Sequence, residues 1–278
     1  MKKVLFIILN YNSSKYTIQC INSLKTISKK TVNFFMIIDN GSTVESLDEI
    51  LNIKDIEKNI IMIKNNNNLG FAKANNIGIN YAIKEKMDYV CLLNNDTKII
   101  DSEFVTKIVD IFEDNKDIIA ISPVMYFEDM QLNRSYGFFP IKKYINSLML
   151  KRLSKKKNSE ILNSKENVYT RVDYISGACM IIKLNVKDTL NFLDEDYFFY
   201  CEDMQFAFTA KKENMKVGIA PNARLIHFGG GSTNEKSKYN KMLIEMEKKF
   251  VSKNYTAVQK IEYFILFNIH RLAKIILD

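Results

Sequence analysis

The sequence has no run of about 18 apolar residues, the length that a membrane-spanning helix requires. A signal peptide needs a longer apolar region than the run Val4–Leu9, which Asn10 and Tyr11 bring to an end. We interpret this run as a buried strand rather than as a targeting segment. These absences lead us to expect a cytoplasmic protein that can also lie at the inner face of the cell membrane.

Cysteine is sparse, and its spacing excludes two kinds of site. The four cysteines match neither a metal-binding knuckle nor a redox pair, and they are Cys20, Cys91, Cys179 and Cys201. Each lies among apolar residues, so we expect all four to be small buried residues of a protein in a reducing compartment. We find no internal repeat.

The chain carries a net charge of +8, with 40 Lys and Arg against 32 Asp and Glu. A basic balance indicates an anionic partner, such as nucleic acid, a phosphorylated substrate or an acidic membrane, unless the lysines only cover a solvated surface. The basic residues are scattered and form no readable nucleic-acid-binding motif, so we expect no nucleic-acid partner.

The first half of the chain alternates short apolar runs with amphipathic segments. The apolar runs predict strands at Val4–Leu9, Phe34–Ile38, Ile60–Ile63 and Tyr89–Leu93. The amphipathic segments predict helices at Tyr16–Ile27, Leu47–Ile53, Ala72–Lys86 and Glu103–Glu113. This alternation predicts an α/β fold with a mostly parallel central sheet, in which ligands bind at the carboxyl ends of the strands.

The second half is less regular. We predict extended segments at Ser122–Phe127, Arg134–Gly137, Tyr174–Lys183, Lys216–Ile219 and Ala223–Ile226, the first two as a strand pair. We predict helices at Glu202–Asn214, Asn234–Lys253 and Ala257–Leu277. The lysine-rich stretch Lys142–Lys165 is interpreted as a mobile loop or a short helix.

Polar clusters follow the predicted strands. In Asp39-Asn40-Gly41-Ser42, the carboxylate could accept hydrogen bonds from a nucleobase or a ribose, or it could only begin a turn. Asn94 and Asp96 are two residues apart, a spacing that aims both the same way if the strand continues. One carboxylate with one amide suits a divalent cation held mainly by a diphosphate, although an Asx turn is the alternative.

Three further polar clusters lie at the ends of predicted elements. Two are at helix starts, and the third follows a strand. Asn68-Leu69-Gly70-Phe71 could receive an anion or polar sugar groups at a helix start, or cap that helix. At Glu202-Asp203 a helix start would keep Asp203 ionised and able to act as a base, whereas repulsion from Glu202 opposes this. Helix capping with dipole pairing is the alternative and the commoner reason for acids at such a position. His227, before a glycine-rich turn, could ligate a metal or contact phosphate, or be structural.

In this order, and with Asn10-Tyr11-Asn12, Asn75-Asn76-Ile77-Gly78 and Ser176-Gly177-Ala178 added, the motifs resemble family-two glycosyltransferases, closest to a bacterial rhamnosyltransferase-like branch. The resemblance covers roughly residues 1–235. It implies a GT-A fold with a Rossmann-like sheet, a nucleotide-binding half over about 1–97 and an acceptor-side half over about 98–233. A helical segment over 234–278 would follow.

The resemblance also implies roles for individual residues. The donor nucleotide-sugar would contact Asn10, Tyr11, Asn12, Asp39, Asn68, Gly70, Phe71, Asn75, Asn94, Asn95 and Asp96, with the base held by Asp39. Asn94 and Asp96 correspond to the family's metal-binding Asp-x-Asp, so Asp96, with His227, would bind Mn²⁺ or Mg²⁺. Asp203 corresponds to the catalytic base. The acceptor side would be formed by Ser176, Gly177, Ala178 and Glu202.

The implied activity is inverting transfer of a single sugar, such as rhamnose, from a dTDP- or UDP-sugar. The acceptor would be a glycan or a polyprenyl-linked glycan of a bacterial surface polysaccharide, such as a capsule or O-antigen. Gln205 and Thr209 stand where relatives carry an acid and an arginine, which leaves a degenerate, scaffold-like glycosyltransferase as the alternative.

Two other classes of protein fit less well. The absence of tryptophan removes the Gln-x-x-Arg-Trp element of processive synthases. Asn-Tyr-Asn-Ser-Ser after the first strand replaces the basic, glycine-rich loop of sugar-nucleotide pyrophosphorylases. The apolar and basic helix 257–277 is expected either to lie on an anionic membrane or to pack on the main domain or on a second subunit in an oligomer.

Overall fold

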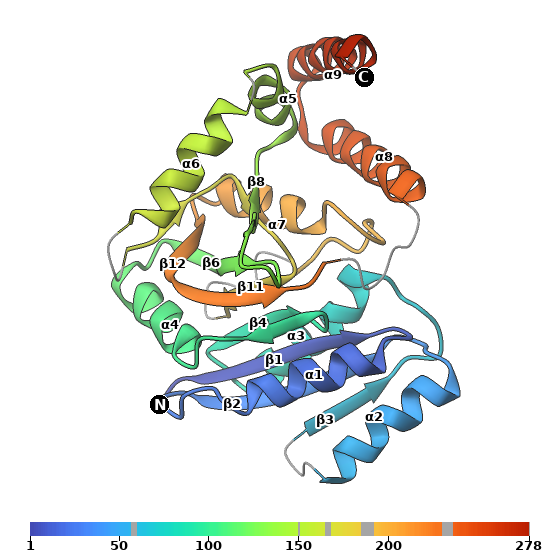
Figure 1. Cartoon of the computed structure of the whole chain (residues 1–278), viewed down its shortest axis with the longest axis vertical. Coiled ribbons are helices and arrows are strands. Elements are labelled where there is room, and N and C mark those ends of the chain that lie inside the picture. The colour runs from blue at the N-terminus through green and yellow to red at the C-terminus, as the bar shows by residue number, and fades with distance from the viewer. Residues whose placement is uncertain (57–59, 150, 165–167, 185–191, 230–235, 278) are drawn as a thin grey trace.

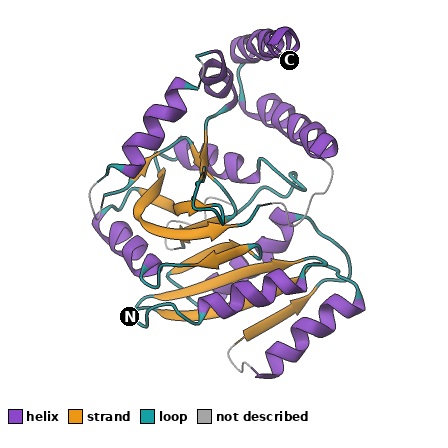
Figure 2. Ribbon diagram, in the orientation of Figure 1, coloured by secondary structure: helices purple, strands orange, loops and turns teal. Residues whose placement is uncertain are grey.

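The structure is a computed structural model that describes residues 1–56, 60–149, 151–164, 168–184, 192–229 and 236–277. A central sheet lies between helices, and the last two helices lie at the end of the molecule away from β3 (Figures 1 and 2). The sheet contains β1 (Lys3–Asn10), β2 (Val32–Asp39), β3 (Ile60–Lys64), β4 (Tyr89–Asn94), β5 (Thr97–Ile99), β6 (Ile118–Tyr126), β7 (Leu132–Asn133), β9 (Thr170–Arg171), β11 (Cys179–Lys183) and β12 (Lys216–His227). A separate pair is formed by β8 (Tyr136–Gly137) and β10 (Tyr174–Ile175).

The described helices follow the predicted alternation in the first half of the chain. They are α1 (Ser14–Leu24), α2 (Val44–Ile56), α3 (Phe71–Lys84), α4 (Phe104–Asp114), α5 (Pro140–Leu148), α6 (Arg152–Leu162), α7 (Glu202–Lys212), α8 (Lys236–Asn254) and α9 (Ala257–Leu277). The predicted boundary between 233 and 234 lies outside the described residues. None of the described helices is long and apolar enough to cross a membrane.

The strand order is β3-β2-β1-β4-β11-β6-β12-β5, and the predicted mostly parallel sheet is confirmed. β1 is parallel to β2 and β4, whereas β11 runs antiparallel to β4 and β6. In register, Asn10 is paired with Asp39 and Leu9 with Asn94. β12 is parallel to β6, so its last residue, His227, lies at the same carboxyl-end edge.

Side-chain alternation on the strands produces two buried layers. On β1, Phe6 and Ile8 face the layer with α1 and α4, whereas Leu5 and Ile7 face the layer with α3 and α7. A Cβ on Gly78 of α3 would lie 2.5 Å from the Ile7 Cδ1 atom, so this glycine lets α3 pack directly on β1. The four cysteines are free and buried, as predicted.

Of the two alternatives for the lysine-rich stretch, the mobile loop is wrong and the short helix is correct in part, because the stretch contains two short helices, α5 and α6. Pro140 begins α5, where its missing N–H costs nothing, and Tyr144 is buried on the inner side of that helix. In α6 the buried Ile161 packs against the sheet, and the Tyr136 hydroxyl donates to the Asn158 Oδ1 atom over 2.8 Å. Frequent lysines mask this short buried stripe in the sequence.

Three other predictions need smaller corrections. The predicted pairing of Ser122–Phe127 with Arg134–Gly137 is wrong: β6 pairs with residues 132–133, whereas Tyr136–Gly137 pairs with β10. The segment 176–178 interrupts the strand predicted at 174–183. β12 joins two predicted segments across an irregularity between Ala220 and Arg224.

A third buried cluster attaches the C-terminal helices. Tyr144 of α5 contacts the Tyr263 and Phe267 rings of α9, with ring centroids 5.8 and 5.7 Å apart. The Glu247 carboxylate of α8 lies beneath them, 2% exposed, and accepts from the Tyr144 hydroxyl over 2.7 Å and the Tyr263 hydroxyl over 3.2 Å. Lys143 supplies the opposite charge. This carboxylate therefore connects three helices.

We predict that Glu247→Ala lowers the free energy of unfolding by about 2–3 kcal/mol, because it leaves two buried hydroxyls and an ammonium without their acceptor. Urea denaturation measures the change. Glu245→Ala, on the exposed side of the same helix, should change it by less than about 0.5 kcal/mol. Equal effects of the two substitutions would contradict the connecting role of Glu247.

Candidate active site

The carboxyl-end edge of the sheet brings together residues that are far apart in the chain. Asn10, Asp39 and Asn94 end adjacent parallel strands, and Asp96 follows directly. His227 ends β12 and is paired with Thr97 of β5, which places it beside Asp96. Most of the predicted donor and metal residues thus share one edge of the sheet.

Asn10 and Asp39 are both completely buried. The Asn10 Nδ2 group donates to the Asp39 Oδ1 atom over 2.9 Å and to the Ser42 hydroxyl over 3.0 Å. The Ser42 backbone N–H donates to the other oxygen of Asp39 over 3.1 Å, and the Thr17 hydroxyl donates to the Asn10 Oδ1 atom over 2.8 Å. The Asp39 carboxylate thus connects the end of β1 to the loop that follows β2. Its contact with a nucleobase remains a prediction.

Tyr11 and Asn12 form the outer part of the same loop. Asn12 has a φ of 50°, and its Oδ1 atom accepts from the Thr43 backbone N–H at the start of α2 over 2.8 Å. The Tyr11 side chain is 49% exposed. An exposed aromatic ring next to polar loops offers a flat base a surface for stacking.

Asn40 was not among the predicted site residues, yet it ties two loops together. Its Nδ2 group donates to the Asn68 Oδ1 atom over 3.0 Å, and its own Oδ1 atom accepts from the Leu69 backbone N–H over 3.1 Å. The Asn68 Oδ1 atom also accepts from the Gly70 N–H over 2.9 Å. The run of asparagines at 65–68 gave no indication of which side chain would make these contacts.

Gly70 permits a close backbone approach, as predicted, but the approaching group belongs to this chain. Gly70 has a φ of 80°, and a Cβ there would lie 2.5 Å from the carbonyl oxygen of Phe198. The Phe71 N–H, the first of α3, donates to that oxygen over 2.8 Å. Asn75 is buried, and its Nδ2 group donates to the Phe71 carbonyl over 3.0 Å. Contacts of these residues with the donor remain predictions.

Asn76 is a second residue that the predictions omitted. Its Nδ2 group donates to the Leu193 carbonyl over 2.8 Å and to the Glu195 carboxylate over 3.0 Å. Its Oδ1 atom accepts from the Leu193 N–H over 3.1 Å. Asn76 thereby holds α3 against the segment that leads to the acidic pair at 202–203.

Asp96 and His227 form the most direct candidate for cation binding. The His227 Nε2 atom lies 3.3 Å from the Asp96 Oδ1 atom, and the Asn133 amide holds the Nδ1 side of the ring over 3.3 Å. Asn95 points toward α1, where its Nδ2 group donates to the Thr17 hydroxyl over 3.0 Å. Asn94 is half-buried at the end of β4.

The pair fits a divalent cation that also binds substrate. Neighbouring ligand atoms of an octahedral ion with bonds of about 2.1 Å are about 3 Å apart, close to the separation of Asp96 and His227. The described residues contain no group of three or more His, Cys, Asp or Glu side chains that could hold a metal. Such a cation would therefore need further ligands from a diphosphate, from water or from other oxygen donors of the protein.

One short segment joins this edge to the acidic pair. The Ala178 carbonyl accepts from the Asn94 N–H over 2.9 Å, and the Gly177 N–H donates to the Asp203 Oδ2 atom over 3.2 Å. The Met204 N–H donates to the other oxygen of Asp203 over 2.7 Å. Ser176 precedes this bridge and donates its own N–H to the Ser135 carbonyl over 2.8 Å.

The two acids differ in their surroundings. Desolvation raises the pKa of Asp203 to about 6, against the opposing effect of the backbone donors, and the side chain stays partly exposed. Glu202 is 6% exposed, and burial followed by repulsion from Asp203 raises its pKa well above the usual range. The Glu202 Oε2 atom has no hydrogen-bond partner among the described residues. Glu202 therefore favours its neutral form, whereas Asp203 can exchange a proton near neutral pH.

The turn before α7 is backbone-strained. Tyr200 and Cys201 have φ values of 71° and 69°, which side chains other than glycine adopt rarely. This turn directs Glu202 and Asp203 toward Gly177, since a Cβ on that glycine would lie 3.8 Å from the Glu202 Oε1 atom. The sequence indicated the two acidic residues as site candidates, but it did not predict the strained turn that orients them.

Gln205 and Thr209, the positions that depart from the expected pattern, are joined in a neutral network. The Gln205 Nε2 group donates to the Thr209 hydroxyl over 3.3 Å, and its Oε1 atom accepts from the Asn254 amide over 2.6 Å. The Tyr197 hydroxyl donates to the same oxygen over 3.2 Å. These neutral side chains therefore attach α7 to α8. They do not form the charged acid and arginine contacts that the resemblance implies at these positions.

Solved structures share this fold at low sequence identity. GalNAc-T7 with UDP, GalNAc and Mn²⁺ superposes with a TM-score of 0.63 at 15% identity, over 98% of this chain and 55% of that one. The mannosyltransferase PcManGT of Pyrobaculum calidifontis with GDP-Man and Mn²⁺ gives 0.62 at 12% identity, over 97% and 69% of the two chains. The fold is that of the GT-A glycosyltransferases, as predicted.

Residues 5–177, more than half of the chain, match the model described as Glycosyl transferase family 2, and the chain belongs to that family. The low-salt glycan biosynthesis hexosyltransferase Agl10 of Haloferax volcanii is 25% identical over 232 residues, 80% of this chain and 66% of that protein. The dTDP-rhamnosyl transferase RfbF of Shigella flexneri is 24% identical over 221 residues, 80% and 67% of the two chains. The chain spans about two thirds of the length of these relatives.

Proposed function

We propose that this protein catalyses inverting, metal-dependent transfer of a single sugar from a nucleoside-diphosphate sugar to an acceptor hydroxyl. The observation that carries the proposal is the bridge at 177–178. It holds the Asp203 carboxylate next to the strand end that bears Asn94 and Asp96. This arrangement supports a proton acceptor and a cation site at one edge of the sheet.

The chemistry needs few groups of the protein. Asp203 accepts the proton of the acceptor hydroxyl as that oxygen attacks the anomeric carbon. Asp96 and His227 would hold a Mn²⁺ or Mg²⁺ ion, which supplies charge neutralisation for the departing diphosphate. Glu202, in its neutral form, avoids adding a second negative charge beside Asp203. One displacement inverts the anomeric centre, so no second nucleophile is required.

The relatives support a donor and an acceptor class. A dTDP-rhamnosyl transferase is among the curated relatives, which favours a dTDP-sugar such as dTDP-rhamnose, and UDP and GDP-Man occur in the structural neighbours. One relative is named for glycan biosynthesis, which supports a glycan as the acceptor. We propose that this glycan belongs to a bacterial surface polysaccharide and is either free or linked to a polyprenyl carrier. Nucleotide binding is assigned to the loops around Tyr11, Asp39 and Asn68.

We further propose that α9 lies on an anionic membrane, where a lipid-linked acceptor would be located. The helix buries Tyr263 and Phe267 against α5 and α8. Its opposite side exposes a row of apolar residues at helical spacing: Val258, Ile261, Ile265, Ile269 and Leu272. An apolar row on a basic protein suits insertion into the boundary region of acidic lipids.

The experiment that tests the proposed activity is a thermal-shift screen of UDP, dTDP, GDP and CMP, each with Mn²⁺ and with EDTA. We expect one nucleoside diphosphate to raise the Tm only in the presence of Mn²⁺, by an amount equivalent to about 2.7 kcal/mol at 100 times its Kd. His227→Ala should remove the metal-dependent part of the shift, because it removes one of two candidate ligands.

His270→Ala is the matched control, since it removes the other histidine of the chain, on α9, and should keep the ligand-induced shift. If no nucleotide stabilises the protein under either condition, the scaffold alternative replaces the proposed transferase.

We predict that Asp203→Asn lowers kcat by about 10²–10⁴-fold while leaving the Kd for the donor nucleotide within about twofold. Because the base acts when deprotonated, kcat/KM of the unmodified protein should fall as the pH drops through about 6, the pKa of Asp203. Steady-state kinetics over the range about pH 5–8 measure both effects.

Glu213→Gln, at the far end of α7, is the control and should leave kcat and the pH profile unchanged. Loss of nucleotide binding in Asp203→Asn would contradict the proton-transfer role and would indicate that Asp203 binds the donor.

We predict that the double variant Ile261→Glu/Ile265→Glu reduces co-sedimentation with phosphatidylglycerol vesicles by about tenfold or more, since it places two carboxylates in the apolar row. Ser252→Asp/Gln259→Glu adds the same charge at exposed positions outside that row and should bind as the unmodified protein does. Equal binding by the first variant would show that the row does not contact lipid.

A further inference from the structure

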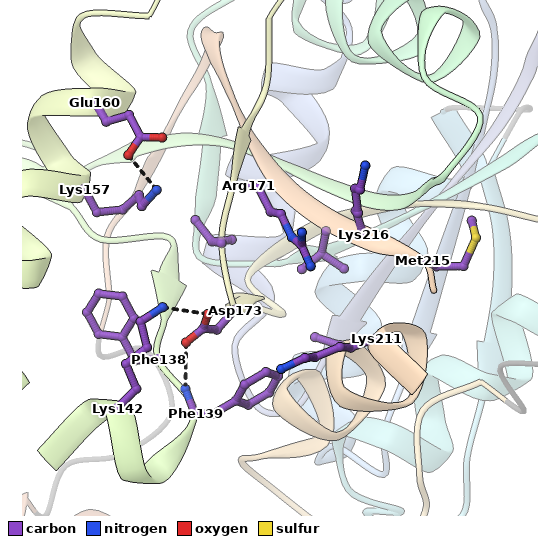
Figure 3. A pocket seen from close by; sticks show the side chains of 13 residues that line it. Phe138, Phe139, Lys142, Lys157, Glu160, Arg171, Asp173, Lys211, Met215 and Lys216 are labelled. Carbon is purple, nitrogen blue, oxygen red and sulfur yellow. Dashed lines mark hydrogen bonds and ion pairs between the residues drawn. The ribbon is translucent and has the colours of Figure 1, made fainter. Parts of the chain in front are cut away.

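A cavity of about 310 Å³ lies at the other end of the sheet from the candidate active site. It is open to solvent and is lined by residues of α5, α6, the β9–β10 region, α7 and the start of β12 (Figure 3). Lys216, the first residue of β12, contributes to its wall, whereas His227 is the last residue of the same strand. Its lining shares no residue with the candidate active site.

The lining is strongly basic. Five cationic and two acidic side chains surround the cavity, an excess of three positive charges: Lys142, Lys157, Arg171, Lys211 and Lys216 against Glu160 and Asp173. These residues come from separate elements, so folding gathers them, and the excess is not a run of lysines in the sequence.

Both acidic side chains are already neutralised by lysine. The Lys142 ammonium donates to the Asp173 carboxylate over 2.9 Å, and the Phe139 backbone N–H donates to its other oxygen over 3.3 Å. The Lys157 ammonium donates to the Glu160 carboxylate over 2.6 Å. Neither carboxylate therefore offsets the remaining cations of the cavity.

Arg171 and Lys211 are the cations that remain. Lys216 is paired with Asp117 outside the lining. Within the described part of the chain, no carboxylate forms an ion pair with Arg171 or Lys211, and Figure 3 shows both side chains directed toward the middle of the cavity. Two unneutralised cations around one hollow favour an anionic occupant.

Two aromatic rings position the lysines. The Lys142 ammonium lies 4.9 Å from the centroid of the Phe138 ring, and the Lys211 ammonium lies 5.5 Å from that of Phe139. Both rings are largely buried, so they are fixed supports. Cation–π contact restrains two long side chains that would otherwise move freely in solvent, which reduces the entropy lost when a ligand binds.

We propose that this cavity binds a small phosphate-bearing molecule, with Arg171 and Lys211 as its principal ligands. The planar fork of Arg171, on β9, matches the oxygen atoms of a phosphate, and the ammonium of Lys211, on α7, adds a point charge. The volume is at the low end for ligand pockets, which favours a single small molecule over a polymer. This inference does not depend on the proposed sugar transfer.

Isothermal titration calorimetry with inorganic pyrophosphate and with inorganic phosphate, in EDTA and at constant ionic strength, tests the proposal. EDTA suppresses metal-assisted binding of pyrophosphate at the candidate active site. We expect saturable binding of at least one of the two probes to the full chain. Arg171→Ala/Lys211→Ala should weaken it by about tenfold or more, since each substitution removes a charged hydrogen-bond donor.

Lys212→Ala is the matched control. It removes a lysine next to Lys211 whose ammonium lies over the Phe208 ring and which does not line the cavity. The affinity of Lys212→Ala for the probe should stay within about twofold of the affinity of the unmodified protein. An equal loss in this variant would show a non-specific basic surface, and the absence of saturable binding of either probe would overturn the proposal.

A third variant separates the two possible binding positions. His227→Ala should bind the probes as tightly as the unmodified protein, because His227 lies at the opposite end of β12. Loss of binding in this variant would place the probe at the candidate active site and overturn the proposal. Circular dichroism of each variant excludes unfolding as the cause of a lost signal.

Discussion

Two backbone hydrogen bonds at 177–178 connect the carboxyl end of β4 to the start of α7. The Asn94 N–H to Ala178 carbonyl contact continues the sheet from β4 into β11. The Gly177 N–H to Asp203 contact, one residue earlier, fixes the start of α7 above the same strand end. Without this bridge, the strand end that bears Asn94 and Asp96 and the Asp203 carboxylate would belong to separate elements with no defined distance between them.

The part of the site that the sequence could predict lies directly on strand ends. Asp39, Asn94 and Asp96 follow apolar runs whose pairing is dictated by burial, so their common location follows from a parallel sheet. Asn40 and Asn76 could not be distinguished from their asparagine neighbours, since their roles depend on segments 28 to 117 residues away. Long-range partners of this kind leave no local pattern in a sequence.

In the second half of the chain, local sequence patterns are insufficient to predict the structure. The helices α5 and α6 bury few apolar residues each, and frequent lysines on their outer sides weaken the periodicity that reveals a helix. The basic cavity is still harder to predict, because its lining residues are contributed by several elements. Likewise, the raised pKa of Asp203 follows from desolvation in the folded protein and not from its residue type.

The buried contacts of Asn10, Asp39 and Asn40 have a thermodynamic consequence. They fix the loops that follow β1, β2 and β3 through side chains of the protein itself, so the conformational entropy of those loops is lost when the chain folds. A donor that meets these loops would need to order little additional backbone. Its association would then depend mainly on desolvation and direct contacts, and loosening the asparagine contacts would weaken affinity even where the donor touches none of them.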